Sequence, residues 1–159
     1  MAEEKTNVMR LLEQSGVSYV PHSYPHGKEA VDGADVAARL GIEPQRVFKT
    51  LVTRGGGGGF FVFVLPVSAA LDLKKAARAA GEKSVEMIHV AEINKVTGYV
   101  RGGCSPLGMK KAYPTCFDET ALLWDAILVS AGRIGAQVEA NAEALAALCG
   151  GHFADLTRA

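Results

Sequence analysis

The segment from residue 47 to residue 65 constrains the fold most, because it holds two apolar runs separated by glycine. Residues 47–53 and 60–65 each have the length and the β-branched and aromatic content of a strand. The five consecutive glycines at 55–59 lie between them, where a chain reverses direction easily. No lysine-serine pair and no helix start follows these glycines, as a phosphate-binding P-loop requires. The segment therefore predicts a central β-hairpin with a flexible glycine tip.

Helical patterns surround this hairpin at irregular intervals. The apolar spacing predicts helices over residues 8–12, 36–40, 73–80 and 142–148 and a helical turn over 91–96. Asp72 and Asn141 are suited to cap two of these helices, and glycine follows several of them. Further strands are expected at residues 17–19 and near Tyr99, Thr115, Ile127 and Val138.

This order of elements lacks a repeated βαβ period and predicts an α+β fold with a mixed, mainly antiparallel sheet flanked by helices. A small doubly wound α/β fold is the alternative. The chain has 159 residues, with 48% hydrophobic and 21% charged residues, which is typical of a globular protein. We find no linker or internal repeat, so we expect a single domain over residues 1–159.

Charge and cysteine content exclude several classes of function. The formal net charge is +0, so no global basic field favours DNA, and any contact with RNA must be local. The cysteines at 104, 116 and 149 form no Cys-x-x-Cys pair and suit neither a disulfide framework nor a zinc site. No apolar signal core or membrane-spanning stretch is present. We therefore expect a cytoplasmic protein with no bound metal or cofactor.

Residues 97–111 have the composition of a ligand-binding loop. They contain four glycines, Pro106 and a terminal pair of lysines. Glycine lets backbone N–H groups approach a ligand closely, and proline stiffens the loop between them. A glycine-rich connection between two strands would have the same composition, so this segment alone does not decide between the two.

Four places in the sequence carry groups that can do chemistry. Lys49 interrupts an apolar strand, where its ammonium group either faces a cleft or lies on the solvent face. Tyr24 stands between His22 and His26 in what reads as an exposed corner, where nothing nearby completes a metal site. The turn that begins at Ser130 presents a hydroxyl and backbone amides, but without the spacing of a serine-hydrolase triad. Cys104 is a nucleophile only if a nearby cation stabilises its thiolate.

Taken together, these motifs resemble the YbaK family of Cys-tRNA(Pro) deacylases, related to the editing domain of bacterial prolyl-tRNA synthetases. The resemblance covers residues 8–156, with its blocks in the expected order. It is carried by Val-Phe-Lys-Thr-Leu at 47–51, Leu-Asp-Leu-Lys-Lys at 71–75, Val-Glu-Met at 85–87, Thr-Gly-Tyr at 97–99, Gly-Gly-Cys-Ser-Pro-Leu-Gly at 102–108 and Val-Ser-Ala-Gly at 129–132.

The resemblance implies a barrel-like mixed sheet and an enzyme that removes cysteine wrongly attached to tRNA(Pro). The substrate's own thiol attacks the ester, so the protein supplies orientation and oxyanion stabilisation rather than a nucleophile. The implied partners are the aminoacylated 3′ end of tRNA and prolyl-tRNA synthetase. The implied catalytic residues are Lys49 and Gly102, and the implied substrate-binding residues are Tyr24, Gly103, Ser105, Pro106, Ser130 and Gly132.

Two positions depart from the family pattern. Residues 29–33 lack an aromatic that some members carry, and Gln137 stands where others have an acid. Release of alanine or serine instead of cysteine therefore stays open. So do a non-catalytic module that binds tRNA ends or nucleotides and a redox protein centred on Cys104, which would lose its function on Cys104→Ser substitution.

Overall fold

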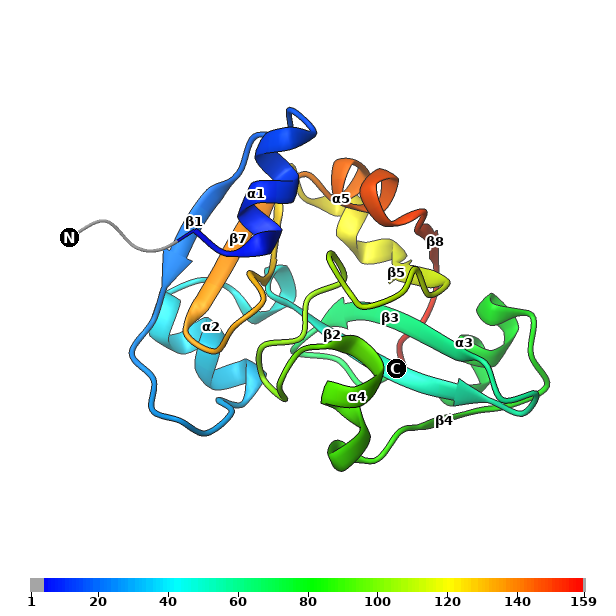
Figure 1. Cartoon of the computed structure of the whole chain (residues 1–159). Coiled ribbons are helices and arrows are strands. Elements are labelled where there is room, and N and C mark those ends of the chain that lie inside the picture. The colour runs from blue at the N-terminus through cyan, green and yellow to red at the C-terminus, as the bar shows by residue number, and fades with distance from the viewer. Residues whose placement is uncertain (1–4, 159) are drawn as a thin grey trace.

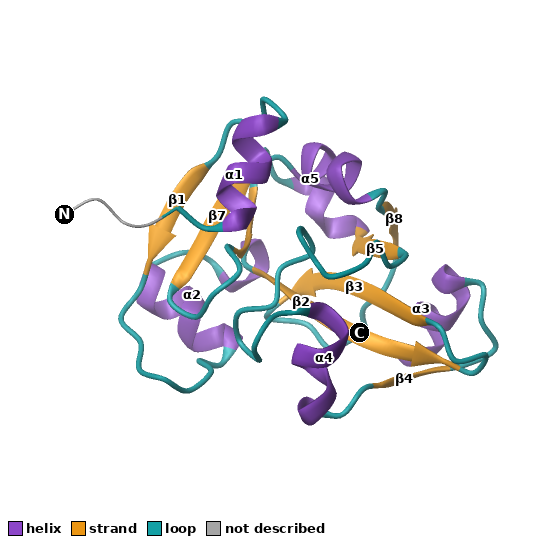
Figure 2. Cartoon of the chain, viewed as in Figure 1, coloured by secondary structure: helices purple, strands orange, loops and turns teal. Residues whose placement is uncertain are grey.

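The computed structural model describes residues 5–158, whose strands form two β-sheets (Figures 1 and 2). The first sheet has the strand order β1–β7–β6, with bounds Val20–Ser23 (β1), Ala136–Ala140 (β7) and Ile127–Ser130 (β6). The second has the order β4–β2–β3–β5–β8, with bounds Val85–Met87 (β4), Phe48–Gly55 (β2), Phe60–Pro66 (β3), Thr115–Asp118 (β5) and His152–Ala154 (β8).

Five α-helices and three 3-10 turns are described around the sheets. The α-helices are Asn7–Gln14 (α1), Gly33–Leu40 (α2), Leu73–Ala80 (α3), Ile93–Thr97 (α4) and Ala142–Cys149 (α5). The 3-10 turns are Pro44–Arg46 (η1), Val90–Glu92 (η2) and Glu119–Leu123 (η3). Antiparallel pairs predominate, with β3–β5 and β5–β8 parallel, so the α+β prediction is confirmed.

The predicted hairpin is the antiparallel pair β2–β3, and its second strand is buried on both faces. Val62 and Val64 belong to the core cluster that joins the two sheets and α1. Phe63 and Leu65 point the other way and pack against the helix α3. Alternate side chains of a strand point to opposite faces. A strand buried on both faces needs the continuous apolar run that the sequence shows.

The two sheets meet where β2 begins. Val47 forms a parallel bridge with Leu128 of β6. Beside it, the guanidinium group of Arg46 forms an ion pair with Glu139 of β7, and its Nε donates a hydrogen bond to the carbonyl of Ala126 at 3.1 Å. These contacts hold the start of β2 against the first sheet.

Helix α2 covers the face of the first sheet that lies near this junction. Val36 and Ala37 of α2 form a buried cluster with Tyr24, Val47 and Leu128. In Figure 1, α2 lies below the β1–β7 pair. The helix ends at Gly41, which adopts φ +69° and terminates it with a left-handed residue.

Two predicted strands are wrong. The expected strand at 17–19 is instead an extended lead-in whose Val17 and Tyr19 pack against the core, because the partner strand β7 pairs with residues 20–23. The expected corner at 22–26 is consequently part strand, and Tyr24 is buried rather than exposed. The expected strand near Tyr99 is part of a loop. In this loop the Tyr99 hydroxyl donates a hydrogen bond to the carbonyl of Leu107 at 2.5 Å.

We expect Leu65→Ala to lower the free energy of unfolding by about 2–5 kcal/mol, because it leaves a cavity under α3. Leu65 is 0% exposed, whereas Leu123 is 80% exposed and serves as the matched control. Leu123→Ala should change the stability by less than about 0.5 kcal/mol. Urea unfolding of both variants measures the difference, and equal losses would contradict the two-faced burial of β3.

Candidate functional site

A cavity of about 430 Å³ lies between β2, the first sheet and helix α2. Its walls are mostly apolar, as is typical of small-molecule sites. It is lined by residues 47–52 around the start of β2, Ser130 of β6, Gln137 of β7, Val31, Gly33, Val36, Val67, Met87, Ile88, Val90, Ile93, Arg101, Gly102 and Cys104. None of these residues is a histidine, aspartate or glutamate.

Lys49 of β2 places its charge in this cavity. It forms no ion pair with a carboxylate among the described residues. Burial lowers the pKa of its ammonium group below the usual lysine value, and the negative charge of Asp32 partly opposes that shift. A half-buried cation without a close protein partner is available to an anionic or electron-rich group of a ligand.

Ser130 and Gln137 lie side by side on the facing sheet. They are Cα partners in the antiparallel pair β6–β7, so their side chains share a face. The Ser130 hydroxyl oxygen accepts a hydrogen bond from the N–H of Gly132 at 3.1 Å. Gln137 Oε1 and Thr50 Oγ1 are buried and have no hydrogen-bond partner among the described residues. Besides the charged Lys49 and Arg101, three uncharged polar side chains therefore interrupt the apolar walls, namely Thr50, Ser130 and Gln137.

The glycine-rich loop reaches the cavity through Gly102. A Cβ atom at Gly102 would lie 2.8 Å from Cβ of Ala30, and the residue also adopts φ +86°. At Gly103, an added Cβ would lie 2.9 Å from Cα of Arg133. Glycine at these two positions thus lets the loops around residues 30, 102 and 133 pack against one another at one end of the cavity.

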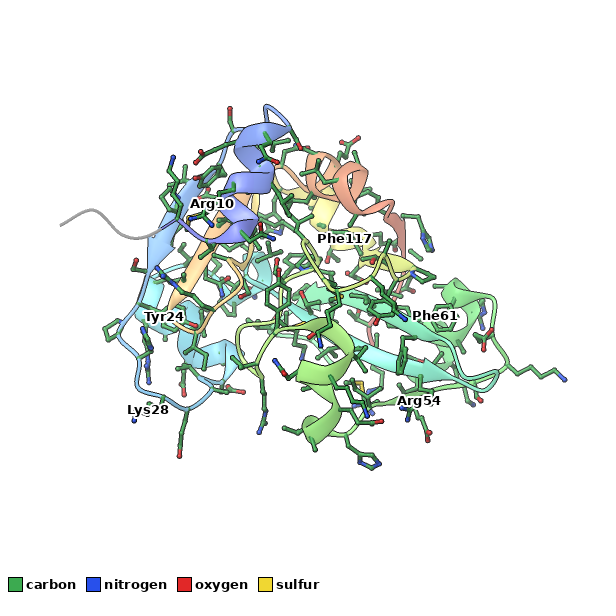
Figure 3. All side chains as sticks on the ribbon, viewed as in Figure 1. Arg10, Tyr24, Lys28, Arg54, Phe61 and Phe117 are labelled. Carbon is green, nitrogen blue, oxygen red and sulfur yellow. The ribbon has the colours of Figure 1, made fainter. Side chains whose placement is uncertain are left out.

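The cavity contains three of the residues predicted from the sequence, namely Lys49, Gly102 and Ser130. The other five do not line it. Tyr24 (Figure 3) is buried against Val36 and Ala37 of α2, and Gly103 lies against the backbone of Arg133. Ser105 is buried in the loop, with its hydroxyl oxygen accepting from the Leu107 N–H at 3.3 Å, and Pro106 is also buried. The predicted roles themselves stay predictions.

Gly132, the last of these five, faces Tyr99 and Val8, since an added Cβ would lie 3.1 Å and 3.3 Å from their side chains. Sequence reasoning did not assign Thr50 or the aliphatic wall that Met87, Val90 and Ile93 form. No local pattern marks these residues, because they come from four elements, and Thr50 on β2 meets the segment 87–93 only in the folded chain.

Cys104 lines the cavity but is poorly suited to act as a nucleophile. Burial raises the pKa of its thiol to about 11, so the thiol is protonated at neutral pH. The thiolate is the reactive form of cysteine, and no cation of residues 5–158 offsets this effect of burial. The structure therefore argues against a redox or nucleophilic role for this residue.

A second, outer hollow of about 680 Å³ adjoins the cavity and shares Val31, Gly33, Arg101 and Gly102 with it. Lys28 and Glu29 also line this hollow, and Figure 3 shows Lys28 on the loop before α2. Arg101 is exposed, whereas Gln137 is only 5% exposed. The cavity thus has a charged mouth and a buried inner end.

The run of glycines at the tip of the hairpin does not form an anion site. The N–H of Gly57 donates to Oε1 of Glu82 at 3.4 Å, so a carboxylate already lies against the tip. Its negative charge would repel a phosphate at this position.

Comparison with known proteins agrees with this geometry. A family model for the aminoacyl-tRNA editing domain matches residues 28–148. The chain belongs to this family. An Enterococcus faecalis member, named "Putative Cys-tRNA(Pro)/Cys-tRNA(Cys) deacylase EbsC", is 47% identical over 155 residues, which cover 98% of this chain and 94% of the relative.

Solved structures of other proteins share the fold of this editing-domain protein. One is described as "a putative trans-editing enzyme for prolyl tRNA synthetase", with a TM-score of 0.80, 26% identity and coverage of 98% of this chain and 100% of the other. Another, "hypothetical protein APE2540", has a TM-score of 0.85, with coverage of 95% of this chain and 99% of the other. Its identity is 23%, so this similarity shows the fold alone. No helix among residues 5–158 is long and apolar enough to cross a bilayer.

We expect Gly103→Ala to cost about 1–3 kcal/mol of stability, because its Cβ would overlap the backbone of Arg133. Gly27→Ala is the matched control, since a Cβ there meets nothing within 4 Å. Thermal and urea unfolding of the two variants test this expectation. A Gly103→Ala variant as stable as Gly27→Ala would show that the loops do not depend on this contact.

The pKa of the Lys49 ammonium should lie below about 10.4, the usual lysine value, because the group is partly buried. The pKa of Lys75 should lie above that value, because its ammonium group donates a hydrogen bond to the Asp155 carboxylate. NMR titration of labelled lysine side chains measures both midpoints, and Lys49→Arg assigns the resonance. Between its folded and unfolded pKa values Lys49 binds more protons in the unfolded chain, so stability should rise with pH there. A Lys49 midpoint at or above that of Lys75 would contradict the burial of its charge.

Proposed function

We propose that this protein is a trans-acting aminoacyl-tRNA deacylase that removes cysteine from mischarged tRNA(Pro). The observation that carries the proposal is a cavity into which the half-buried cation of Lys49 projects and whose lining residues include no histidine or carboxylate. A hydrolase triad needs a histidine or carboxylate beside its nucleophile, and none lines this cavity. The attacking group is then best supplied by the substrate, whose cysteinyl thiol lies next to the ester.

In the proposed reaction the cysteinyl sulfur forms a bond to the ester carbonyl carbon, and the carbon–oxygen bond to the ribose breaks. The thiol proton ends on the departing ribose oxygen, so the products are a cyclic thiolactone and uncharged tRNA. The attack is intramolecular because thiol and carbonyl belong to the same cysteinyl group, and the cavity contributes to the rate by holding the two in the reactive orientation. Water then opens the thiolactone to free cysteine.

Two groups of the chain stabilise this reaction. The Lys49 ammonium binds the terminal phosphate or ribose of the tRNA, where its charge fixes the position of the ester. The N–H of Gly102 lies at the cavity wall, and no carbonyl among the described residues accepts a hydrogen bond from it. This amide is free to donate to the oxyanion that develops on the carbonyl.

The aminoacyl end alone provides few contacts for a whole tRNA. The net charge is +0, and the mouth of the cavity combines Lys28 and Arg101 with Glu29 and Asp32. We therefore propose that prolyl-tRNA synthetase holds the tRNA body while this protein, acting in the cytoplasm as one editing domain over the whole chain, takes the 3′ end. The family match over residues 28–148 and the relative that matches 98% of the chain support a single editing domain.

The test is deacylation of Cys-tRNA(Pro), with Ser-tRNA(Pro), Ala-tRNA(Pro) and Cys-tRNA(Cys) measured alongside. Lys49→Ala should lower kcat/KM by about 100- to 1000-fold, because it removes the charge that positions the ester. Lys83→Ala is the matched control, since Lys83 is exposed and outside both hollows. Lys49→Arg keeps the charge and should retain part of the rate.

Other results of this assay would support a different substrate or a different class of protein. Loss of alanine or serine in preference to cysteine would keep the fold and site but replace the thiol mechanism. Binding of the tRNA without loss of any amino acid would indicate a binding module instead of an enzyme.

A further inference from the structure

The described residues contain two buried side-chain atoms without hydrogen-bond partners, and both line the candidate active site. They are the hydroxyl Oγ1 of Thr50 on β2 and the amide oxygen Oε1 of Gln137 on β7. Buried polar atoms in folded proteins are nearly always hydrogen-bonded, because an unmade bond lowers stability. Two such atoms on residues that line one cavity indicate hydrogen bonds that a ligand completes.

The side chains next to Gln137 on the two neighbouring strands already have polar partners within the protein. On β1, its Cα partner His22 has Nε2 at 2.8 Å from Glu139 Oε1. On β6, its Cα partner Ser130 accepts the N–H of Gly132. Gln137 lies on the central strand of its sheet and is 5% exposed, so its backbone position is fixed. The unpaired oxygen therefore faces a partner that comes from outside the chain.

An amide oxygen only accepts hydrogen bonds, which limits the group it can bind. In the proposed substrate, phosphate oxygens and the ester carbonyl are acceptors too, and a thiol is a weak donor. The α-ammonium group carries three N–H donors and a positive charge, and charge-assisted bonds are the stronger ones. Since no carboxylate lines the cavity, neutral oxygens are the acceptors that remain.

The depth of Gln137 also favours the amino acid over the nucleotide. Arg101 is exposed at the mouth, Lys49 is half-buried, and Gln137 and Ser130 are buried at the inner end. A substrate that enters by its aminoacyl end brings the α-ammonium group deepest and leaves the ribose and phosphate near Lys49.

We propose that Gln137 Oε1 and Thr50 Oγ1 bind the α-ammonium group of the aminoacyl ester, a proposal that rests on the proposed deacylase function. The site then recognises the amino group as well as the side chain. Acylation of the nitrogen removes its charge and two of its three N–H donors. N-acylated esters, peptidyl-tRNA among them, are accordingly poor ligands, which spares growing chains from hydrolysis.

The experiment compares two unreactive ligands by calorimetry. One is 3′-deoxy-3′-(L-cysteinylamino)adenosine, and the other is its deamino counterpart, which carries a 3-mercaptopropionyl group. The wild type should bind the amino ligand about 10- to 100-fold more tightly. Gln137→Met, which matches the volume without the oxygen, should lose most of this preference. Thr50→Val should lose part of it, and Gln137→Glu should keep it.

The free variants provide a second readout. If both oxygens lack partners in the unliganded protein, Gln137→Met and Thr50→Val should raise the melting temperature by about 2–4 °C each. A lower melting temperature would show that the oxygens are already satisfied, and would overturn the proposal.

Two binding results would also overturn it. One is equal affinity of the wild type for both ligands, and the other is an equal loss for both ligands in Gln137→Met, which a ribose contact would produce. The proposed function fails separately: a protein that prefers the amino ligand but does not deacylate Cys-tRNA(Pro) keeps the ammonium site and loses the deacylase assignment. A protein that deacylates Cys-tRNA(Pro) without that preference keeps the function and loses this site.

Discussion

The junction between the two sheets at the start of β2 is the contact on which the rest of the molecule depends. Val47 bridges to Leu128, and Arg46 pairs with Glu139, so one end of β2 is fixed to the first sheet. The remainder of β2 belongs to the second sheet through its pairing with β3 and β4. The cavity lies between β2 and the first sheet. Lys49 contributes a cation from β2, and Ser130 and Gln137 contribute polar groups from the first sheet.

The cavity lowers the stability of the fold, and the cost is concentrated in a few groups. Lys49 keeps a charge whose burial lowers its pKa, and Thr50 and Gln137 keep buried oxygens without partners. A core filled with apolar side chains at these positions would be more stable. Such local violations of the rules of folding are expected where a protein holds a site ready for a ligand.

The sequence predicted the parts of the fold that local chemistry determines. Asp72 caps α3 with its side chain, and Asn141 caps α5 in the same way. The hairpin follows from two apolar runs and a glycine turn. The strands β4 and β8 have only three residues each, and their positions depend on long-range pairing that no local pattern encodes. The loop around Tyr99 has the apolar residues of a strand, but Tyr99 packs against the core without a partner strand and Val100 is exposed.

The pairing of β1 with β7 joins residues 20–23 to residues 136–139, and it determines when the site can exist during synthesis. Lys49 emerges from the ribosome well before the strands that carry Ser130 and Gln137, and a chain that grows residue by residue has only one wall of the cavity until then. A nascent or prematurely terminated chain therefore holds the lysine without the facing sheet. The candidate site can form only after residue 137 has been added to the chain.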